Sequence, residues 1–375
     1  MQITVPTAVP FFDGGPAQAG LKDRILDDIA ALIDENDFTN GPAVAAFEAG
    51  FADYCGNRFC VGTASGLDAL RLGLLASDLE PGDEVIVPAN TFVATLEAVT
   101  QAGGRPVLAD VAETDYNLDS AAAAAAVSAR TRFLLPVHLY GQLADMAALA
   151  GLASSRDLVL VEDACQAPGA SRGGVRAGSA LTAAFSFYPA KNLGAFGDAG
   201  ALVTGSEQIA DRVRALREHG QRVKYRHEFE GYTARLDTIQ ALVLLHKLPH
   251  LGDWNEERRA LARMYLERLD GVGDLVLPHP VAESEPVWHL FVVRTADPDA
   301  LGAFLATRGI GTGRHYPEPA HLSAAYEWLG VERGAFPVTE TLAREVLSLP
   351  IFPGMSEEQV DAVVAGVRAF FHNGA

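Results

Sequence analysis

The fold is decided by the stretch Ala183-Ala-Phe-Ser-Phe-Tyr-Pro-Ala-Lys-Asn-Leu-Gly-Ala-Phe-Gly-Asp198, which has the pattern of a short apolar strand followed by a turn that carries one lysine. Lysine is rare in this chain. There are four, Lys22, Lys191, Lys224 and Lys247, among 29 lysines and arginines. Arginine stays protonated in proteins, whereas a lysine amine can lose its proton and form a Schiff base. Lys191 is therefore a candidate for chemistry that needs a neutral amine.

A second stretch, Leu158-Val-Leu-Val-Glu-Asp-Ala-Cys-Gln-Ala-Pro-Gly169, has the pattern of a buried strand that ends on a carboxylate. At the carboxyl end of a parallel strand, Asp163 would lie in the crevice where open α/β sheets bind ligands. A lysine and a carboxylate at one edge suit pyridoxal 5'-phosphate (PLP), because Lys191 can hold its aldehyde and Asp163 can keep its pyridine nitrogen protonated. Taken singly, Asp163 also fits a helix N-cap and Lys191 a solvated loop residue.

The composition limits the class of protein. A formal net charge of −19 over 375 residues argues against binding to nucleic acid or to an anionic membrane surface. The cysteines Cys55, Cys60 and Cys165 are odd in number and form no CxxC pair, so neither a disulfide framework nor a metal site is predicted. The first six residues lack the basic segment of a signal peptide, and no apolar run is long enough to span a membrane. We expect a cytoplasmic protein.

Apolar segments separated by helical patterns predict an α/β fold with a mostly parallel, doubly wound sheet. The expected strands are a segment beginning at Phe59, Glu84–Pro88, Arg105–Asp110, Arg132–His138, Leu158–Glu162, Ala183–Tyr188 and Gly200–Thr204. After residue 250 the pattern changes to a long charged helix and one clear strand, Trp288–Arg294. We therefore predict an N-terminal arm (residues 1–40), a large domain (residues 41–250) and a smaller C-terminal α+β domain (residues 251–375).

Two further segments are candidates for ligand contacts. The turn Ser65-Gly66-Leu67 separates a short strand from a helix, and free amides at such a helix start can bind a phosphate. Phe92 follows another strand end and could stack on a planar cofactor, although core packing explains most phenylalanines.

A basic loop, Gly220-Gln-Arg-Val-Lys-Tyr-Arg-His227, could clamp a phosphorylated substrate, and a surface or subunit-contact role explains it equally well. His315 and Tyr316 lie in a glycine-rich loop that no strand precedes, so it is not a dinucleotide-binding fingerprint. From the sequence alone, these two residues fit pocket lining and loop packing equally well.

Six motifs along the chain occur together in one known family. They are Gly41-Pro-Ala-Val-Ala-Ala-Phe-Glu48, Gly82-Asp-Glu-Val-Ile-Val-Pro88, Pro136-Val-His-Leu-Tyr-Gly141, Asp163-Ala-Cys-Gln166, Phe185-Ser-Phe-Tyr-Pro-Ala-Lys-Asn-Leu-Gly194 and Gly231-Tyr-Thr-Ala-Arg-Leu-Asp237. In this order the chain resembles the PLP-dependent sugar aminotransferases of the DegT/DnrJ/EryC1/StrS family, from about Gly41 to the region of Pro350. The resemblance implies fold type I and a homodimer whose two active sites lie at the subunit interface.

The resemblance also implies roles for individual residues. Lys191 would carry PLP, Asp163 would face its pyridine nitrogen and Gln166 its ring hydroxyl. The remaining cofactor contacts implied are Ser65, Gly66, Leu67 and Ser186 for the phosphate and Phe92 for the ring. The substrate contacts implied are Tyr188, Lys224, Tyr225, His315 and Tyr316. Thr233 departs from the family, which has an asparagine there that reaches the neighbouring subunit's cofactor phosphate.

The implied reaction moves an amino group from an amino acid, L-glutamate in most similar enzymes, to a nucleotide-linked keto sugar. The continuation Lys191-Asn-Leu-Gly-Ala-Phe-Gly-Asp198 resembles members that aminate C-3, so the leading substrate is a dTDP-3-keto-6-deoxyhexose. A UDP-linked 3-keto sugar and amination at C-4 remain alternatives. A related sugar 3-dehydratase is disfavoured because histidine replaces the lysine there. A regulatory protein on the same fold is disfavoured because Lys191, Asp163 and Ser186 are all retained.

Overall fold

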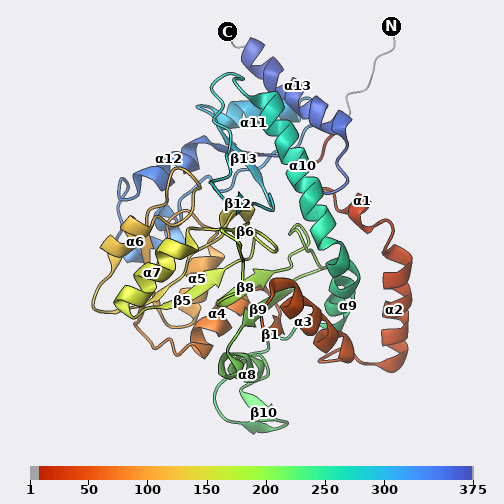
Figure 1. The fold of residues 1–375 in the computed structure, drawn as a ribbon, viewed down its shortest axis with the longest axis vertical. Helices are drawn as coiled ribbons and strands as arrows, with labels where there is room; N and C mark the ends of the chain where they lie inside the picture. Colours follow the sequence, from red (N-terminus) through yellow and green to blue (C-terminus); the bar gives the residue numbers. More distant parts are fainter. Residues whose placement is uncertain (1–7, 374–375) are drawn as a thin grey trace.

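A seven-stranded sheet forms the centre of the computed structural model, which describes residues 8–373 (Figure 1). The strand order is β1-β9-β8-β5-β4-β2-β3, and within this sheet only β9 runs antiparallel to its neighbours. The strands are β1 (Phe59–Thr63), β2 (Glu84–Pro88), β3 (Arg105–Ala109), β4 (Thr131–Leu134), β5 (Val159–Asp163), β8 (Thr182–Ser186) and β9 (Gly200–Thr204). The predicted mostly parallel α/β sheet is confirmed.

Helices cover both faces of the sheet because its strands are apolar on both sides. Val85 and Val87 of β2 belong to one core, whereas Ile86 between them belongs to another. The first face packs against α4 (Gly66–Ala76), α5 (Ala94–Gln101) and α8 (Glu207–Leu216). The second packs against α3 (Pro42–Cys55), α6 (Ser120–Ala126), α7 (Met146–Arg156) and α9 (Thr238–Lys247).

The C-terminal region has a core of its own, shared by its helices and a two-stranded antiparallel sheet. The elements that share it are α10 (Leu251–Leu269), β13 (Phe291–Arg294), α11 (Pro298–Ala306), β14 (Val346–Leu349) and α13 (Glu357–Asn373), whereas α12 (Pro337–Glu345) packs through Leu342 on the core of the large sheet. The first turn of α10 contributes Trp254 to a cluster with Ile25 and Val243, and its later residues enter the C-terminal core (Figure 1). Because α10 joins both regions, the predicted division at residue 250 remains a prediction.

The N-terminal segment crosses to the C-terminal region. It contains α1 (Gly15–Gln18) and α2 (Lys22–Glu35), and Val9 forms a bridge with Ile310. The predicted arm began at residue 1, and the signal-peptide argument used residues 1–6; residues 1–7 lie outside the described part.

Short elements complete the fold. They are β6 (Ser171–Arg172), β7 (Val175–Arg176), β10 (Gln221–Val223), β11 (Arg226–His227), β12 (Ser284–Glu285) and the 3₁₀ turns Leu139–Gly141, Leu248–His250, Ala320–Leu322 and Ala324–Leu329. Among residues 8–373, no helix is both long enough and apolar enough to cross a membrane.

Candidate active site

A pocket of about 530 Å³ opens at the carboxyl edge of the parallel strands. All eight predicted cofactor residues line it: Ser65, Gly66, Leu67, Phe92, Asp163, Gln166, Ser186 and Lys191. Three of the five predicted substrate residues line it as well, namely Tyr188, His315 and Tyr316. Lys224 and Tyr225 are absent from its walls. The sheet therefore brings together residues that lie far apart in the sequence.

Lys191 stands in a tight turn between the neighbouring strands β8 and β9. Its backbone N–H donates to Tyr188 O at 2.8 Å. The turn needs glycine at position 194, where a Cβ atom would lie 2.2 Å from Pro189 O. Burial lowers the pKa of Lys191 below its usual value, while Cys165 and Asp163 act in the opposite direction. The turn thus holds a lysine whose amine loses its proton more readily than an exposed one.

Asp163 ends β5 inside the same pocket and is 5 % exposed. Its Oδ1 accepts the backbone N–H of Cys165 at 3.1 Å, and its Oδ2 accepts the hydroxyl of Thr95 at 2.8 Å. Hydrogen bonds to a carboxylate stabilise its ionised form against the cost of burial. Asp163 is therefore built as a buried anion facing a pocket that also contains Lys191.

The turn at the start of α4 lies directly against the end of β8. Ser65 caps the helix, with its Oγ accepting the N–H of Asp68 at 3.0 Å. A Cβ atom at Gly66 would lie 2.7 Å from both Cys165 Sγ and Ser186 Cβ, so only glycine fits. The helix start and the Ser186 hydroxyl therefore converge on one corner of the pocket, as an anion site requires.

Gln166 connects the sheet edge to the C-terminal region. Its Oε1 accepts the N–H of Tyr140 at 2.7 Å, and its Nε2 donates to the hydroxyl of Tyr316 at 3.3 Å. The ring of Tyr316 lies 5.6 Å from that of Phe92, centroid to centroid. One N–H of the Gln166 amide remains for a ligand, and the two aromatic rings flank the space beside it.

His315 forms the wall opposite the sheet. Its Nδ1 lies 2.8 Å from Ser348 Oγ, and its ring stacks on Phe11 at 5.6 Å between centroids. Burial, with a smaller effect of Lys191, lowers the pKa of His315 to about 4. The imidazole is therefore neutral at pH 7 and can accept or donate one hydrogen bond.

Several pocket residues were not predicted from the sequence. They are Phe11, Phe12, Thr91, Thr95, Glu97, Arg258 and His289, which all line the pocket. Thr91 and Thr95 flank Phe92 at helical spacing, a signal that could have identified them. Phe11 and Phe12 reach the pocket only through the bridge between Val9 and Ile310, which no local pattern indicates.

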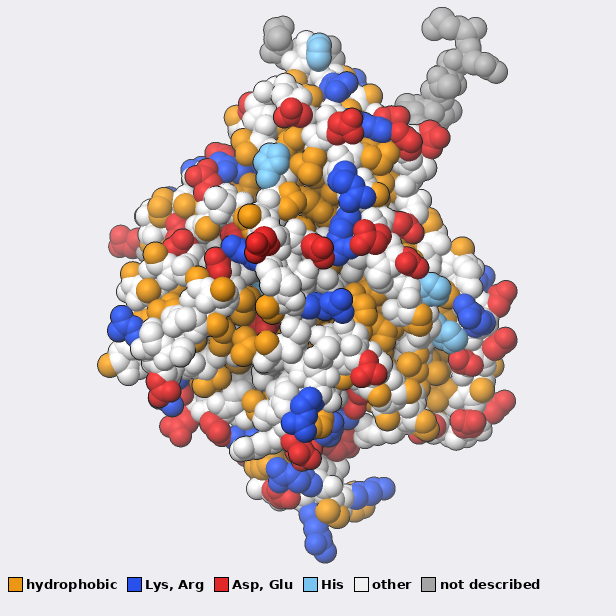
Figure 2. Space-filling view, in the orientation of Figure 1, with side chains coloured by type: hydrophobic (Ala, Val, Ile, Leu, Met, Phe, Trp, Pro, Cys, Tyr) orange, Lys and Arg blue, Asp and Glu red, His pale blue; other side chains and the backbone are white. Residues whose placement is uncertain are grey.

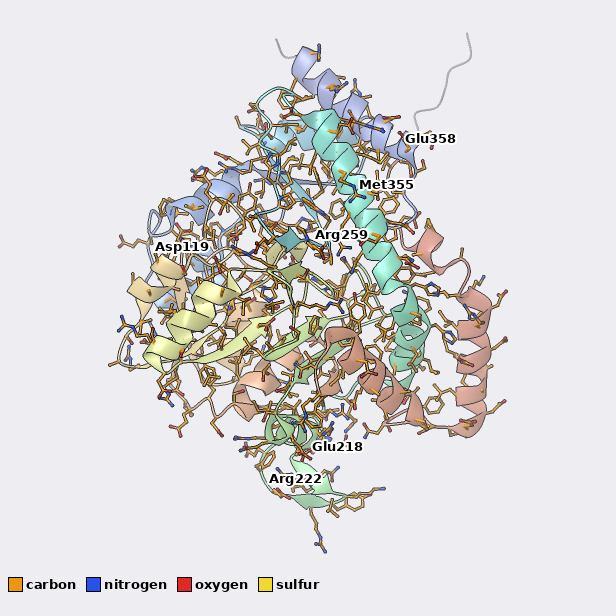
Figure 3. The ribbon with its side chains drawn as sticks, viewed as in Figure 1. Asp119, Glu218, Arg222, Arg259, Met355 and Glu358 are labelled. Carbon is orange, nitrogen blue, oxygen red and sulfur yellow. The ribbon has the colours of Figure 1, made fainter. Side chains whose placement is uncertain are left out.

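Lys224 and Tyr225 lie at the tip of the β10–β11 hairpin, which projects from the molecule below α8 (Figure 1). Tyr225 is 80 % exposed. Figure 2 shows Lys and Arg side chains gathered at this tip, and Figure 3 shows the labelled Arg222 on it, far from the sheet edge. Thr233 is also exposed, with its hydroxyl 3.1 Å from His219 Nε2. Within one chain, these residues do not reach the pocket.

The pocket residues fit PLP. Lys191 can bind an aldehyde, Asp163 presents a buried negative charge, and the Gly66 turn leaves a corner free of side chains for a phosphate. Among residues 8–373, no cluster of three or more His, Cys, Asp or Glu side chains is placed to hold a metal ion. The site can therefore supply a nucleophilic amine, a carboxylate that balances a positive charge on the ligand, and a helix start that binds an anion.

Known proteins resemble this chain over nearly its whole length. The erythromycin biosynthesis sensory transduction protein EryC1 of Saccharopolyspora erythraea is 48 % identical, over 96 % of this chain and 99 % of its own. The dTDP-3-amino-3,4,6-trideoxy-α-D-glucose transaminase of Streptomyces venezuelae is 47 % identical, over 96 % and 95 %. The crystal structure of S. venezuelae DesV in complex with a ketimine intermediate superposes with a TM-score of 0.95 at 46 % identity, over 97 % and 98 %.

The family itself is shown by a sequence profile, whose match covers most of the described structure, including every predicted site residue. That profile describes the DegT/DnrJ/EryC1/StrS aminotransferases and matches residues 20–368. This chain belongs to the DegT/DnrJ/EryC1/StrS aminotransferase family.

Proposed function

We propose that this protein is a PLP-dependent aminotransferase that transfers an amino group from L-glutamate to C-3 of a dTDP-linked 3-keto-6-deoxyhexose. The observation that carries the proposal is the meeting of Lys191, Asp163 and the Gly66 turn in one pocket. Lys191 is the amine, Asp163 the counter-charge and the turn the phosphate site.

PLP supplies an aldehyde that binds amines and a ring that accepts electrons from them. Lys191 would hold the cofactor through its aldehyde, and its Nζ, when free and neutral, would accept a proton from the donor amino acid and give it back. Its lowered pKa favours the neutral amine that this step needs. Asp163 stabilises a protonated ring nitrogen, and Gln166 directs its free N–H at the pocket. His315 and Tyr316 form the wall that an acceptor sugar meets.

The acceptor is proposed from the relatives. The S. venezuelae relative is named for a dTDP-linked sugar with its amino group at C-3. A second relative, at 41 % identity, is named for a UDP-linked 3-amino sugar, so the UDP-linked 3-keto sugar is the second candidate. Amination at C-4 is the third.

A substrate comparison tests this proposal. Purified enzyme with PLP and L-glutamate is incubated separately with three acceptors: a dTDP-3-keto-6-deoxyhexose, a UDP-linked 3-keto sugar and a dTDP-4-keto-6-deoxyhexose. Mass spectrometry quantifies each aminated product over time, which gives the rate for each acceptor. We expect the dTDP-linked 3-keto sugar to have the highest kcat/KM, because binding differences of a few kcal/mol separate such analogues by about 10²-fold. Turnover of only the 4-keto sugar would contradict the proposal.

A purely regulatory role is the second candidate, because the 48 % identical relative is named a sensory transduction protein. The pocket argues against it, since a desolvated lysine and a buried carboxylate in one pocket both carry a stability cost that a regulatory protein has no need of. Borohydride treatment of the PLP-loaded protein followed by peptide mass analysis separates the two. A regulatory protein without cofactor chemistry would show no mass increase on the peptide that contains Lys191.

We also propose a homodimer in which each hairpin completes the partner's site. The exposed hairpin carries Lys224 and Tyr225, whose basic and aromatic groups suit a nucleotide diphosphate. Within residues 8–373, neither side chain lines the pocket that contains Lys191. This arrangement is isologous, so each subunit both gives and receives a hairpin.

Subunit mixing tests this arrangement. Lys191→Ala and Lys224→Ala are purified, shown to be weakly active alone, then unfolded and refolded together. A mixed dimer has one pocket with an intact Lys191 that receives an intact hairpin, so about a quarter of wild-type activity is expected at equal amounts. If Lys224 acted on its own chain's pocket, no activity would return.

We propose a cytoplasmic location from the state of the cysteines. Cys55, Cys60 and Cys165 are all free thiols, two of them buried. A reducing cytoplasm keeps such thiols unpaired.

A further inference from the structure

Two buried threonines lie near Asp163, Thr91 in the segment before α5 and Thr95 in the first turn of that helix. Thr95 is 1 % exposed and Thr91 4 % exposed. Thr95 Oγ1 lies 2.8 Å from Asp163 Oδ2 and 2.8 Å from Thr91 Oγ1. Neither hydroxyl has a part in the mechanism above, although both residues line the pocket.

The donor and the acceptor of each hydrogen bond between Thr91, Thr95 and Asp163 can be assigned. An ionised carboxylate only accepts hydrogen bonds, so the Thr95 hydroxyl donates to Asp163. Its single proton is then used, and its oxygen accepts the hydroxyl of Thr91. The hydrogen bonds therefore run in one direction, from Thr91 through Thr95 to Asp163. Hydrogen bonds in series polarise one another, which strengthens the last one.

Among the described residues, the Thr95 hydroxyl is the side-chain donor that contacts Oδ2 of Asp163. Oδ1 is held by the backbone N–H of Cys165, which is unaffected by substitutions at Thr95. Without the Thr95 hydroxyl, Oδ2 of the buried carboxylate loses the donor that fixes its orientation. A carboxylate that is free to rotate holds a proton on the ring nitrogen less firmly.

We propose that Thr95, aligned by Thr91, is a positioning residue that holds the carboxylate of Asp163 aimed at the ring nitrogen of PLP. This inference rests on the proposed function. It predicts that the hydroxyl of Thr95, rather than its shape, sets cofactor affinity and the electron-accepting strength of the bound ring.

Cofactor affinity is the first measurement. Apoprotein is titrated with PLP, and binding is followed by quenching of tryptophan fluorescence. Thr95→Val keeps the shape but removes the donor, so we expect about tenfold weaker binding, the loss typical of one hydrogen bond to a charged group. Thr95→Ser keeps the hydroxyl and should stay within about threefold of wild type.

A matched control exists in the same sheet. Thr182 and Thr204 place their hydroxyls 2.9 Å apart between β8 and β9, with both residues buried and no carboxylate in the pair. Thr182→Val removes a buried hydroxyl of the same kind. It should change thermal stability but leave PLP affinity at the wild-type value. An equal loss of affinity in this control would show that the effect at Thr95 is merely structural.

A modified cofactor is the second measurement. N-methyl-PLP carries a permanent positive charge on the ring nitrogen, so it does not depend on Asp163 to keep a proton there. In the half-reaction with L-glutamate, the ratio of wild-type to Thr95→Val rates should be about tenfold with PLP and about threefold or less with N-methyl-PLP. A ratio that is the same with both cofactors would overturn the inference.

The results of these experiments distinguish a failure of the proposed role of Thr95 from a failure of the proposed aminotransferase function. If the wild-type protein neither binds PLP nor accepts an amino group from glutamate, the proposed function fails. If it does both, and Thr95→Val equals Thr95→Ser in affinity, the inference alone fails. Should Thr95→Val not fold, Thr91→Val replaces it, with an expected loss of about threefold in PLP affinity. An unchanged affinity there would also overturn the inference.

Discussion

Replacing Lys191 with alanine is expected to lower kcat by at least about 10³-fold, because the chain loses both the amine that holds PLP and the group that moves the proton. Lys191→Arg should be equally inactive, since a guanidinium stays protonated. Rates of keto-sugar amination measure the loss. The absorbance band of PLP bound to the protein's amine should be absent from both variants.

Two controls make this result specific. Lys22 is an exposed lysine at the start of α2, so Lys22→Ala should keep wild-type rates. Lys191→Ala should remain folded by circular dichroism, because loss of the amine also removes its desolvation cost, whereas Lys191→Arg keeps the charge and is compared only if its circular dichroism spectrum matches that of the wild type. Retention of more than about a tenth of the wild-type rate in Lys191→Ala would remove the lysine from the mechanism.

The second large effect is expected for Asp163→Asn, which keeps the shape of the side chain and removes its charge. An amide cannot hold a proton on the ring nitrogen, so the ring accepts electrons less well, and kcat should fall by about 10²-fold or more. Stopped-flow measurement of the half-reaction with glutamate isolates this step from binding of the sugar.

A carboxylate at the other end of the same strand is the natural control. Asp157 precedes β5, is exposed and has a left-handed backbone conformation with φ of 53°. Asparagine tolerates that conformation well, so Asp157→Asn should change neither stability nor rate. If Asp163→Asn also transferred amino groups at the wild-type rate, Asp163 would not be the partner of the ring.

The sheet edge could be predicted because each strand end has its own sequence signal. β2 and β9 have the predicted bounds, and Lys191 and Asp163 follow neighbouring strands into one pocket. The family, the fold and the aminotransferase class followed from the same motifs and are confirmed. The roles of single residues remain predictions.

Other parts could not be predicted, for physical reasons. β14 was missed because it follows α12 without a turn residue, so its short apolar run looks like a helix end. Phe11 and Phe12 were missed because a bridge to the distant Ile310 positions them. For Lys224 and Tyr225, a sequence motif gives the residue type but not which subunit's pocket it serves.

The stack of Phe11 on His315 has a practical consequence for protein engineering. The sheet side of the pocket is formed by strand ends, whereas this stacked pair joins two distant chain segments at the opposite wall. A combinatorial library confined to Phe11 and Phe12 would reshape the acceptor space while keeping the contact between Gln166 and Tyr316. For the same reason, an affinity tag is better fused after α13 than ahead of the residues that form this wall.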